Sequence, residues 1–307
     1  MTRPMRATAK ATTPGSAVTE RREGRSDLAP PPRESILDCV NAALAEDIGS
    51  GDLSADLLPA DARVEARVIS REAAVIAGRP WFDACFGQID AGVSISWEVD
   101  EGQAVTPDQV LCRLRGRARS LVSAERCALN FLQTLSATAT TTAAHVAQIE
   151  GTGAVILDTR KTLPGLREAQ KYAVRAGGGQ NHRMGLYDAI MLKENHIAAA
   201  ASIGAAVQRA RQLHPDAPLI CEVETLDELQ QALAASVAHV LLDEFDLDAL
   251  REAVRLNAGR AKLEASGGIE RDGLRAIAET GVDYISIGAI TKHIRAVDLS
   301  MRVVATG

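Results

Sequence analysis

Basic and imidazole side chains follow one another in turns or at element ends of the segment 158–196. They are Arg160, Lys161, His182, Arg183 and Lys193. Like charges that are held together repel unless an anion neutralises them. Arginine forks match carboxylates, whereas lysine suits phosphate as a point charge. The segment therefore predicts a strongly anionic ligand, with carboxylates facing the arginines and Lys193, and a phosphate or pyrophosphate facing Lys161.

Acidic side chains end two neighbouring strands that are predicted in the second half of the chain. Glu222 and Asp243 at these ends suit Mg²⁺, ribose hydroxyls or both, and they also balance the charge of the basic cluster. Glu224 shares a face with Glu222 because side chains alternate along a strand. Glu224 is the second candidate for this binding role, because it could instead pair with a basic neighbour.

Glycine-containing loops follow the last two predicted strands, Ser266-Gly267-Gly268 and Ile287-Gly288-Ala289. Glycine lets the backbone approach a ligand, and exposed N–H groups bind phosphate. The loops after the late strands of a βα barrel are a frequent phosphate site. We therefore expect a phosphate at these two loops. No strand directly precedes the run Gly177-Gly178-Gly179, which is predicted to be a turn or lid.

Bulk composition excludes several classes of protein. The 307 residues carry 34 basic and 40 acidic side chains, so there is no global positive field for nucleic acid. No apolar run reaches the roughly 18 residues that a membrane span needs. The five cysteines form no CxxC pair, which argues against disulfides and zinc and fits a reducing cytoplasm. The remaining histidines, His145, His214 and His239, are predicted to be structural or superficial.

The first part of the chain divides into a tail and a helix. Residues 1–33 are rich in Thr, Ala, Arg and Pro without apolar periodicity, which predicts a disordered tail, with an organelle transit peptide as the alternative. Ser35 and Asp38 resemble a capping box at the start of a helix. A turn at 49–52 is expected to end that helix.

Residues 62–118 predict strands, among them a half-buried antiparallel strand within 93–99, where apolar and polar side chains alternate. Residues 119–136 predict a long helix with one buried stripe. Arg126 lies roughly opposite that stripe, where it is free to meet a ligand or another subunit. A solvated surface arginine is the simpler alternative.

From about residue 150 onward, short apolar strands end in a polar group and alternate with helical segments. The predicted strand ends are 155–158, 190–193, 219–222, 240–243, 263–266 and 284–288. Such repetition predicts a parallel sheet with right-handed crossovers. The carboxyl ends of these strands hold the active site in βα barrels, so we expect the charged residues above to converge there.

Long motifs give a resemblance to a known family. Residues 158–166 read Asp-Thr-Arg-Lys-Thr-Leu-Pro-Gly-Leu, 177–183 read Gly-Gly-Gly-Gln-Asn-His-Arg, and 192–196 read Leu-Lys-Glu-Asn-His. With these motifs the chain resembles the quinolinate phosphoribosyltransferases, also called carboxylating nicotinate-nucleotide pyrophosphorylases. The segments 125–130, 241–243, 265–269 and 287–291 match as well. The resemblance covers about residue 34 to the end of the chain.

The resemblance implies an α/β fold with an N-terminal α/β sandwich domain and an incomplete, open βα barrel of the type II phosphoribosyltransferases. The implied divisions are a sandwich domain at 34–138, a catalytic barrel at 139–292 and a C-terminal segment at 293–307 that returns to the sandwich. A homodimer or higher homo-oligomer is implied, with Arg126 reaching into the active site of the partner. No nucleic-acid or membrane partner is expected.

The implied reaction transfers phosphoribosyl from phosphoribosyl pyrophosphate to quinolinate with decarboxylation. Its products are nicotinate mononucleotide, pyrophosphate and CO₂, in the de novo synthesis of NAD. By resemblance, quinolinate binds through Arg126, Thr159, Arg160, His182, Arg183 and Lys193. Phosphoribosyl pyrophosphate with Mg²⁺ engages Lys161, Glu222 and Asp243, the two acids being the metal ligands. The product phosphate rests on Ser266, Gly267, Gly268, Ile287, Gly288 and Ala289. Catalytic roles fall to Lys161, Lys193, Glu222 and Asp243.

The chain departs from the family pattern at two places. Many members have His-Ser after the motif that ends here at Thr291, whereas this chain has Lys292 and His293, so a phosphate role of position 292 passes to lysine. Glu244 stands where Asn is usual, which leaves any role of that position in doubt.

Other functions are alternatives to this reaction. A nicotinate phosphoribosyltransferase needs only one carboxylate clamp, and an aldolase needs its Schiff-base lysine in a largely uncharged pocket. A molybdenum-associated paralogue would not require the full basic set. A non-catalytic sensor of pyridines or nucleotides would not require the two acids.

Overall fold

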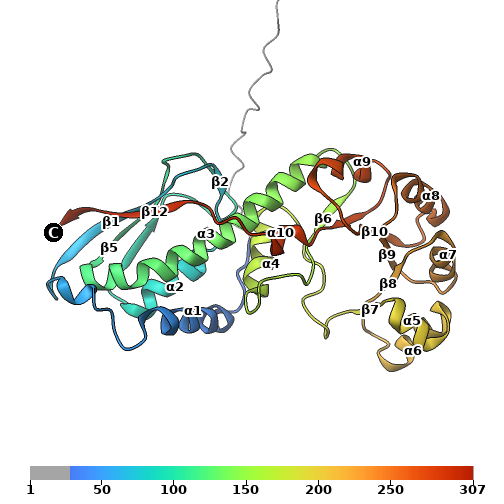
Figure 1. The fold of residues 1–307 in the computed structure, drawn as a ribbon, viewed down its shortest axis with the longest axis horizontal. Coiled ribbons are helices and arrows are strands. Elements are labelled where there is room, and N and C mark those ends of the chain that lie inside the picture. The colour runs from blue at the N-terminus through green and yellow to red at the C-terminus, as the bar shows by residue number, and fades with distance from the viewer. Residues whose placement is uncertain (1–27, 307) are drawn as a thin grey trace, which may run out of the picture.

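The computed structural model describes residues 28–306, which form two lobes along one long axis (Figure 1). Residues 1–27 hold most of the predicted tail and lie outside the described residues. The predicted tail boundary at residue 33 is too late. Leu28 packs against the core of the first lobe, and the carbonyl oxygen of Ala29 accepts a hydrogen bond from Arg175 at 2.9 Å.

The first lobe is built on a four-stranded antiparallel sheet with the strand order β12-β1-β5-β3. Its strands are β1 (Arg63–Ser70), β3 (Ser94–Trp97), β5 (Val110–Arg117) and β12 (Leu299–Thr306). The two-residue strands β2 (Ala74–Val75) and β4 (Ala104–Val105) pair beside it. β5 alternates buried Leu114 with exposed Arg113 and Arg115, which bond to acids on neighbouring strands. One face of the sheet therefore meets solvent and the other meets the core.

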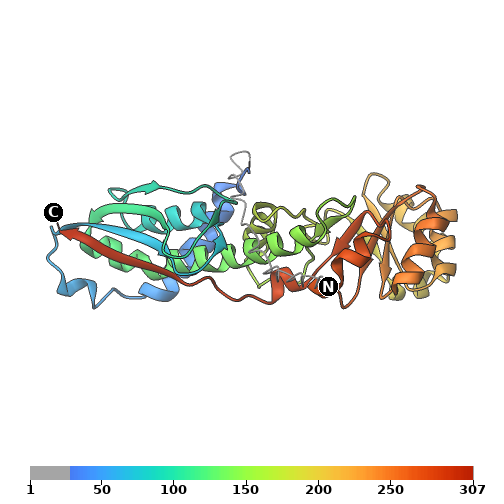
Figure 2. The ribbon, with the colours of Figure 1, turned by 90° about the horizontal axis from the view of Figure 1, so that it is seen from above.

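Three helices cover the core face of this sheet (Figures 1 and 2). They are α1 (Arg33–Ile48), α2 (Arg79–Ile89) and α3 (Ala118–Gln148). The predicted capping box is wrong, because α1 begins at Arg33 after Pro32 and has no side-chain cap, which leaves Ser35 inside the first turn. The strand prediction for 62–118 also missed α2. Its buried residues Trp81, Phe82, Cys85 and Phe86 have helical spacing, and Pro80 occupies its first turn.

The helix α3 runs 12 residues beyond the predicted end at residue 136 and crosses from one lobe to the other (Figure 1). Its second half is rich in threonine, a composition that favours loops because the hydroxyl competes for backbone groups. Here the hydroxyls bond within the helix, Thr140 to Ser136 O and Thr142 to Thr138 O, both at 2.7 Å. The predicted domain boundary after residue 138 falls inside this helix, so the helix itself joins the lobes.

The second lobe contains a six-stranded parallel sheet with the order β6-β11-β10-β9-β8-β7. Its strands are β6 (Val155–Leu157), β7 (Ile190–Leu192), β8 (Leu219–Val223), β9 (His239–Asp243), β10 (Lys262–Ser266) and β11 (Tyr284–Ser286). These positions confirm the predicted strand ends to within two residues. β6 and β7 stand at opposite edges, so the described part of the chain forms an open βα barrel, as predicted. Gln180 bridges to Leu157 of β6 on the open side.

Helices cover the outside of this sheet. They are α5 (Glu194–Ala200), α6 (Ile203–Leu213), α7 (Leu226–Ala234), α8 (Leu247–Asn257) and α9 (Leu274–Ala278). The helix α4 (Arg167–Ala176) packs instead against α3 and the core of the first lobe, and the short α10 (Ala289–Lys292) follows β11. Strand residues such as Val240, Leu263 and Ile285 pack in the apolar core that these helices contribute to. Their neighbours along each strand point the other way, into the open barrel, and many are polar.

Candidate active site

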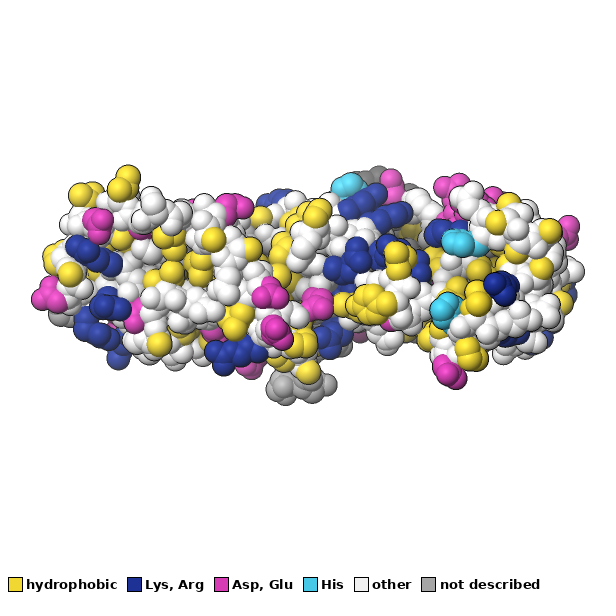
Figure 3. All heavy atoms as spheres, turned by 90° about the horizontal axis from the view of Figure 1, so that it is seen from below, with side chains coloured by type: hydrophobic (Ala, Val, Ile, Leu, Met, Phe, Trp, Pro, Cys, Tyr) yellow, Lys and Arg dark blue, Asp and Glu magenta, His cyan; other side chains and the backbone are white. Residues whose placement is uncertain are grey.

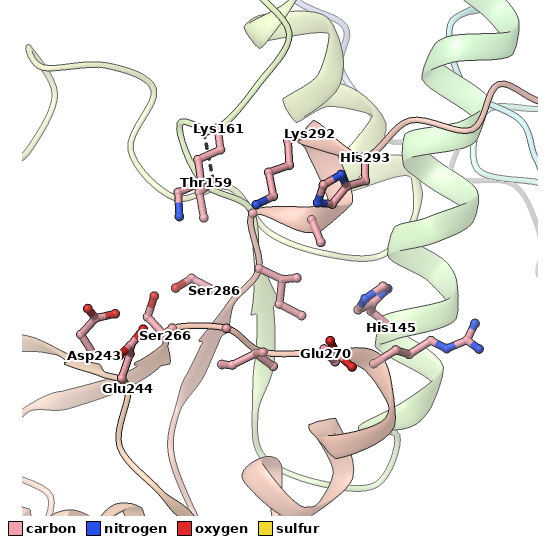
Figure 4. A pocket seen from close by; sticks show the side chains of 17 residues that line it. His145, Thr159, Lys161, Asp243, Glu244, Ser266, Glu270, Ser286, Lys292 and His293 are labelled. Atoms are coloured by element: carbon pink, nitrogen blue, oxygen red, sulfur yellow. Dashed lines mark hydrogen bonds between the residues drawn. The ribbon is translucent and has the colours of Figure 1, made fainter.

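A cavity of about 560 Å³ opens at the carboxyl ends of β6, β9, β10 and β11 (Figure 4). It brings together the predicted residues Thr159, Lys161, Asp243, Ser266, Gly267, Gly268, Ile287, Gly288 and Ala289. Lys161 lies across the cavity from Asp243, with the two glycine loops between them (Figure 4). The structure therefore places the predicted phosphate loops beside the predicted phosphate lysine and one predicted metal ligand.

Neighbouring side chains and backbone approach both glycine loops closely. Gly267 has φ +94°, and a Cβ at this position would lie 2.7 Å from the backbone nitrogen of Glu244. That nitrogen donates to the carbonyl oxygen of Ser266 at 3.0 Å, which joins the ends of β9 and β10. A Cβ on Gly288 would lie 2.8 Å from Cδ of Lys161. Glycine at both positions therefore lets Glu244 and Lys161 pack directly against the backbone of the two loops.

Backbone contacts fix Lys161 while its ammonium group stays exposed. Its N–H donates to Oγ1 of Thr159 at 3.0 Å, and its carbonyl oxygen accepts from Oγ1 of Thr291 at 2.8 Å. Gln170 is fully buried and accepts from the N–H of Leu163 at 2.7 Å while donating to the carbonyl oxygen of Thr291 at 2.8 Å. The loop that carries Lys161 is therefore held against α10 by hydrogen bonds on both sides.

The remaining predicted cations do not line this cavity. Lys and Arg side chains gather over the middle of the molecule on the face shown in Figure 3. Lys193 bonds Oε2 of Glu222 at 2.5 Å, and Arg183 donates to the carbonyl oxygen of Ala189 at 3.0 Å. Burial and the neighbouring charge of Arg160 lower the pKa of Arg183. Nε of Arg160 is buried and has no hydrogen-bond partner among the described residues. Neither guanidinium group forms an ion pair among residues 28–306, although the carboxylates of Asp188 and Glu222 partly offset the lowering of the pKa of Arg183.

A buried ion pair that the sequence did not predict supports this group. Lys171 on α4 and Asp158 at the end of β6 pair with exposures of 1% and 0%. Asp158 also accepts from the side chain of Asn181 at 2.6 Å and from the N–H of His182 at 2.9 Å. Burial raises the pKa of Asp158 and lowers that of Lys171, opposed in each case by the attraction of the partner. This anchor holds the loop 181–183 at the open side of the barrel.

His182 was predicted to bind the ligand, but its ring is turned toward the protein. Nδ1 accepts from the N–H of Arg183 at 2.7 Å, and Nε2 lies 3.3 Å from Oε2 of the fully buried Glu264. His239 bonds the same carboxylate oxygen at 2.8 Å. Glu264 was missed because it sits within an apolar strand, and only the fold brings both imidazoles to it.

The other histidines and Arg126 fall at separate places. His145 is buried, and its Nδ1–H donates to the carbonyl oxygen of Thr141 at 2.7 Å. It lines the cavity together with Arg271, Lys292 and His293. Arg126 is exposed on α3 and is not part of the cavity lining.

Metal ligands are few in the part of the chain that the structure describes. No group of three or more His, Cys, Asp or Glu side chains is arranged to hold a metal ion within residues 28–306. Asp243 faces the cavity (Figure 4) and makes no side-chain hydrogen bond or ion pair with any described residue, whereas Glu222 is engaged by Lys193. A cation here would bind one protein carboxylate together with oxygens of its ligand.

Two family models match the chain. The model described as "Quinolinate phosphoribosyl transferase, N-terminal domain" matches residues 52–136, and its C-terminal counterpart matches residues 138–302. The chain belongs to the quinolinate phosphoribosyltransferase family. The cavity lies in the part that matches the C-terminal domain of this family, together with both groups of cations.

Relatives within the quinolinate phosphoribosyltransferase family extend over most of the chain. A probable carboxylating nicotinate-nucleotide pyrophosphorylase of Bacillus subtilis is 40% identical over 86% of this chain and 92% of its own length. Its counterpart from Synechocystis is 44% identical over 85% and 90%. The solved nicotinate-nucleotide pyrophosphorylase of Francisella tularensis is 45% identical with a TM-score of 0.87, covering 89% of this chain and 97% of that one. No helix among the described residues has the length and apolar character to cross a membrane.

Proposed function

We propose that this member of the family transfers the phosphoribosyl group of phosphoribosyl pyrophosphate to quinolinate. The products are nicotinate mononucleotide, pyrophosphate and CO₂, so the reaction belongs to the de novo synthesis of NAD. The enzyme class is that of the pentosyltransferases. The names of the relatives support this assignment, and so does the chemistry of the two groups of cations around the barrel end.

The observation that carries the proposal is the close pair of Arg160 and Arg183. Each guanidinium is a planar fork that matches one carboxylate, and quinolinate carries two carboxylates on adjacent ring carbons. Burial and then the charge of Arg160 lower the pKa of Arg183, and a dianion between the two guanidinium groups would offset both effects. Nicotinate, with a single carboxylate, would leave one of the two forks without a partner.

Phosphoribosyl pyrophosphate fits the cavity on the other side of Lys161. Its 5′-phosphate, which stays in the product, would rest on the glycine loops, and Lys161 would face the pyrophosphate. Lys292 adds a second ammonium group to the lining of the same cavity. Holding the ribose carbon next to a clamped pyridine nitrogen supplies the proximity that a bimolecular substitution needs.

Mg²⁺ is proposed as the ion that accompanies phosphoribosyl pyrophosphate. The donor set fits it, because Mg²⁺ is commonly bound by one or two carboxylates plus phosphate oxygens. Asp243 would hold it directly, and Glu222 would join if Lys193 turned to the substrate. When bound, Mg²⁺ supplies charge neutralisation for the departing pyrophosphate.

The chemical steps follow from these positions. The pyridine nitrogen forms a bond to the anomeric carbon of the ribose as the bond from that carbon to pyrophosphate breaks, and Lys161 stabilises the departing charge. The ring nitrogen is then quaternary and accepts the electron pair of the bond to the 2-carboxylate, which leaves as CO₂. The ring carbon takes up a proton, for which Lys193 or a water molecule is the source.

The assembly and location are proposals of the same kind. We propose a cytoplasmic homodimer or larger homo-oligomer, in which Arg126 of one copy completes the carboxylate clamp of another. The exposure of Arg126 on α3 and its absence from the cavity lining of its own chain support this arrangement.

Purified protein incubated with quinolinate, phosphoribosyl pyrophosphate and Mg²⁺ tests the reaction. We expect equimolar nicotinate mononucleotide and CO₂. Arg160→Ala should lower kcat/KM for quinolinate about 100-fold, because two charge-assisted hydrogen bonds contribute roughly 1.5 kcal/mol each. Arg209→Ala, at an exposed position of α6, is the matched control and should have no effect. Quinolinate binding without product would favour a sensor or a diverged paralogue, and absence of binding would refute the ligand.

A further inference from the structure

Polar side chains meet inside the open barrel, next to the loop 181–183 that carries Arg183 of the proposed carboxylate clamp (Arg160 and Arg183). Residues of β9, β10 and β11 that face away from the outer helices include His239, Glu264 and Tyr284. The rings of His239 and Tyr284 lie 5.4 Å apart, and Glu264 is completely buried between these strands. An ionised carboxylate in such a position requires hydrogen-bond donors, since burial without them is strongly unfavourable.

The loop 181–183 brings one imidazole next to Glu264 through the open side of the barrel. Gln180 bridges to β6, and the chain then turns so that His182 points inward to Glu264. Because Nδ1 of His182 accepts the N–H of Arg183, the ring proton is on Nε2, which lies 3.3 Å from Oε2 of Glu264 without hydrogen-bond geometry. Nε2 of His239 forms a hydrogen bond of 2.8 Å with the same oxygen.

The balance of these contacts keeps Glu264 ionised. Burial raises the pKa of Glu264, but its contacts with His182, His239 and Ser286 outweigh burial and lower the pKa to about 2. The ring of His182 packs 3.3 Å from Glu264, which limits how that ring can turn. Neither His182 nor Glu264 lines the cavity that holds Lys161 and the glycine loops, whereas Ser286 does.

We propose that Glu264, held in place by His239, is a positioning residue for the quinolinate clamp. Glu264 limits the orientation of the His182 ring. Because Nδ1 of this ring accepts a hydrogen bond from the N–H of Arg183, the backbone of Arg183 is held in place as well. This role rests on the proposed function. Separate contacts hold Lys161, so the structure assigns Glu264 to the binding of the pyridine dicarboxylate and not of the phosphoribosyl donor.

Glu264→Gln and His239→Phe test this assignment, with Glu150→Gln as a control at an exposed position. Glutamine retains the shape of Glu264 but removes its charge, so the oxygen that both imidazoles contact becomes a weaker acceptor. The Kd and KM for quinolinate should rise about tenfold in Glu264→Gln, the effect of one charge-assisted hydrogen bond. The KM for phosphoribosyl pyrophosphate should stay within twofold. His239→Phe should shift quinolinate binding in the same direction, and His239→Gln, which restores a donor, should reverse most of that shift.

Calorimetric titration with quinolinate alone separates this proposal from the proposed function. Absence of quinolinate binding by the unmodified protein would refute the function itself. Unchanged quinolinate affinity in folded Glu264→Gln and His239→Phe would overturn only the positioning role, and so would an equal rise of both KM values. If Glu264→Gln does not fold, as judged by thermal unfolding, His239→Phe and His239→Gln decide the question, because His239 is partly exposed and tolerates replacement more readily.

Discussion

The buried pair of Lys171 and Asp158 offers the sharpest test of how the clamp is supported. Lys171→Met keeps the length and apolar stem of the side chain but removes the ammonium group. Asp158 then remains as a fully buried charge whose partners are only Asn181 and the N–H of His182, and the carbonyl oxygen of His182 loses its donor. Breaking a buried pair in this way costs about 3–5 kcal/mol.

This loss can be measured as a shift of the thermal unfolding midpoint. At about 2–4 °C per kcal/mol, the midpoint should fall by roughly 6–20 °C. Lys262→Met is the matched control, since Lys262 also pairs with an aspartate, Asp283, at 2.7 Å but is 60% exposed. The control should unfold close to the unmodified protein, because exposed pairs are screened by solvent. A Lys171→Met midpoint no lower than that of Lys262→Met would refute the reasoning.

Three further outcomes are expected. Gly177→Ala should destabilise the fold by about 1–3 kcal/mol in a denaturant titration, because its Cβ would lie 2.4 Å from the carbonyl oxygen of Ala139. Gly87→Ala is the control: a Cβ there meets open space within α2, so this change should stabilise the fold by about 0.5–1 kcal/mol. The pKa of Glu264 falls from 4.5 to about 2 on folding, so the stabilisation by its carboxylate is present above about pH 4.5 and is lost toward pH 2. The difference in free energy of unfolding between the unmodified protein and Glu264→Gln should therefore shrink over that pH range. A constant difference would contradict this expectation. Asp243→Asn should raise the Mg²⁺ concentration for half-maximal activity without moving the unfolding midpoint, which a titration with Mg²⁺ would check.

The strands of the barrel were predictable because each carries its own signal. A short apolar run that ends in a polar residue, as at Glu222 or Asp243, marks a buried strand and its reactive end without reference to the rest of the chain. The cations of the segment 158–196 were predictable for the same reason. Their types and their positions in turns are local properties.

The missed features depend on contacts between distant segments. Lys171 reads as a surface residue of a helix until Asp158 is placed beside it, and Glu264 reads as part of a strand until two histidines converge on it. The second half of α3 is missed because threonine propensity favours a loop, whereas burial between the lobes keeps it helical. The ring of His182 turns inward for the same kind of reason, which its sequence neighbours do not reveal.

The pairing of β1 with β12 has a consequence for how the protein is made. These strands are neighbours in the first sheet but are separated by about 230 residues in the chain. At roughly 5–20 residues per second, a ribosome that has released β1 needs on the order of 10–50 s to synthesise β12. During that interval the edge of β1 that later binds β12 exposes unpaired backbone groups, and such edges promote association with other chains. The first lobe to emerge is therefore the last to be completed, and chaperones that bind extended segments have the longest access to residues 63–70.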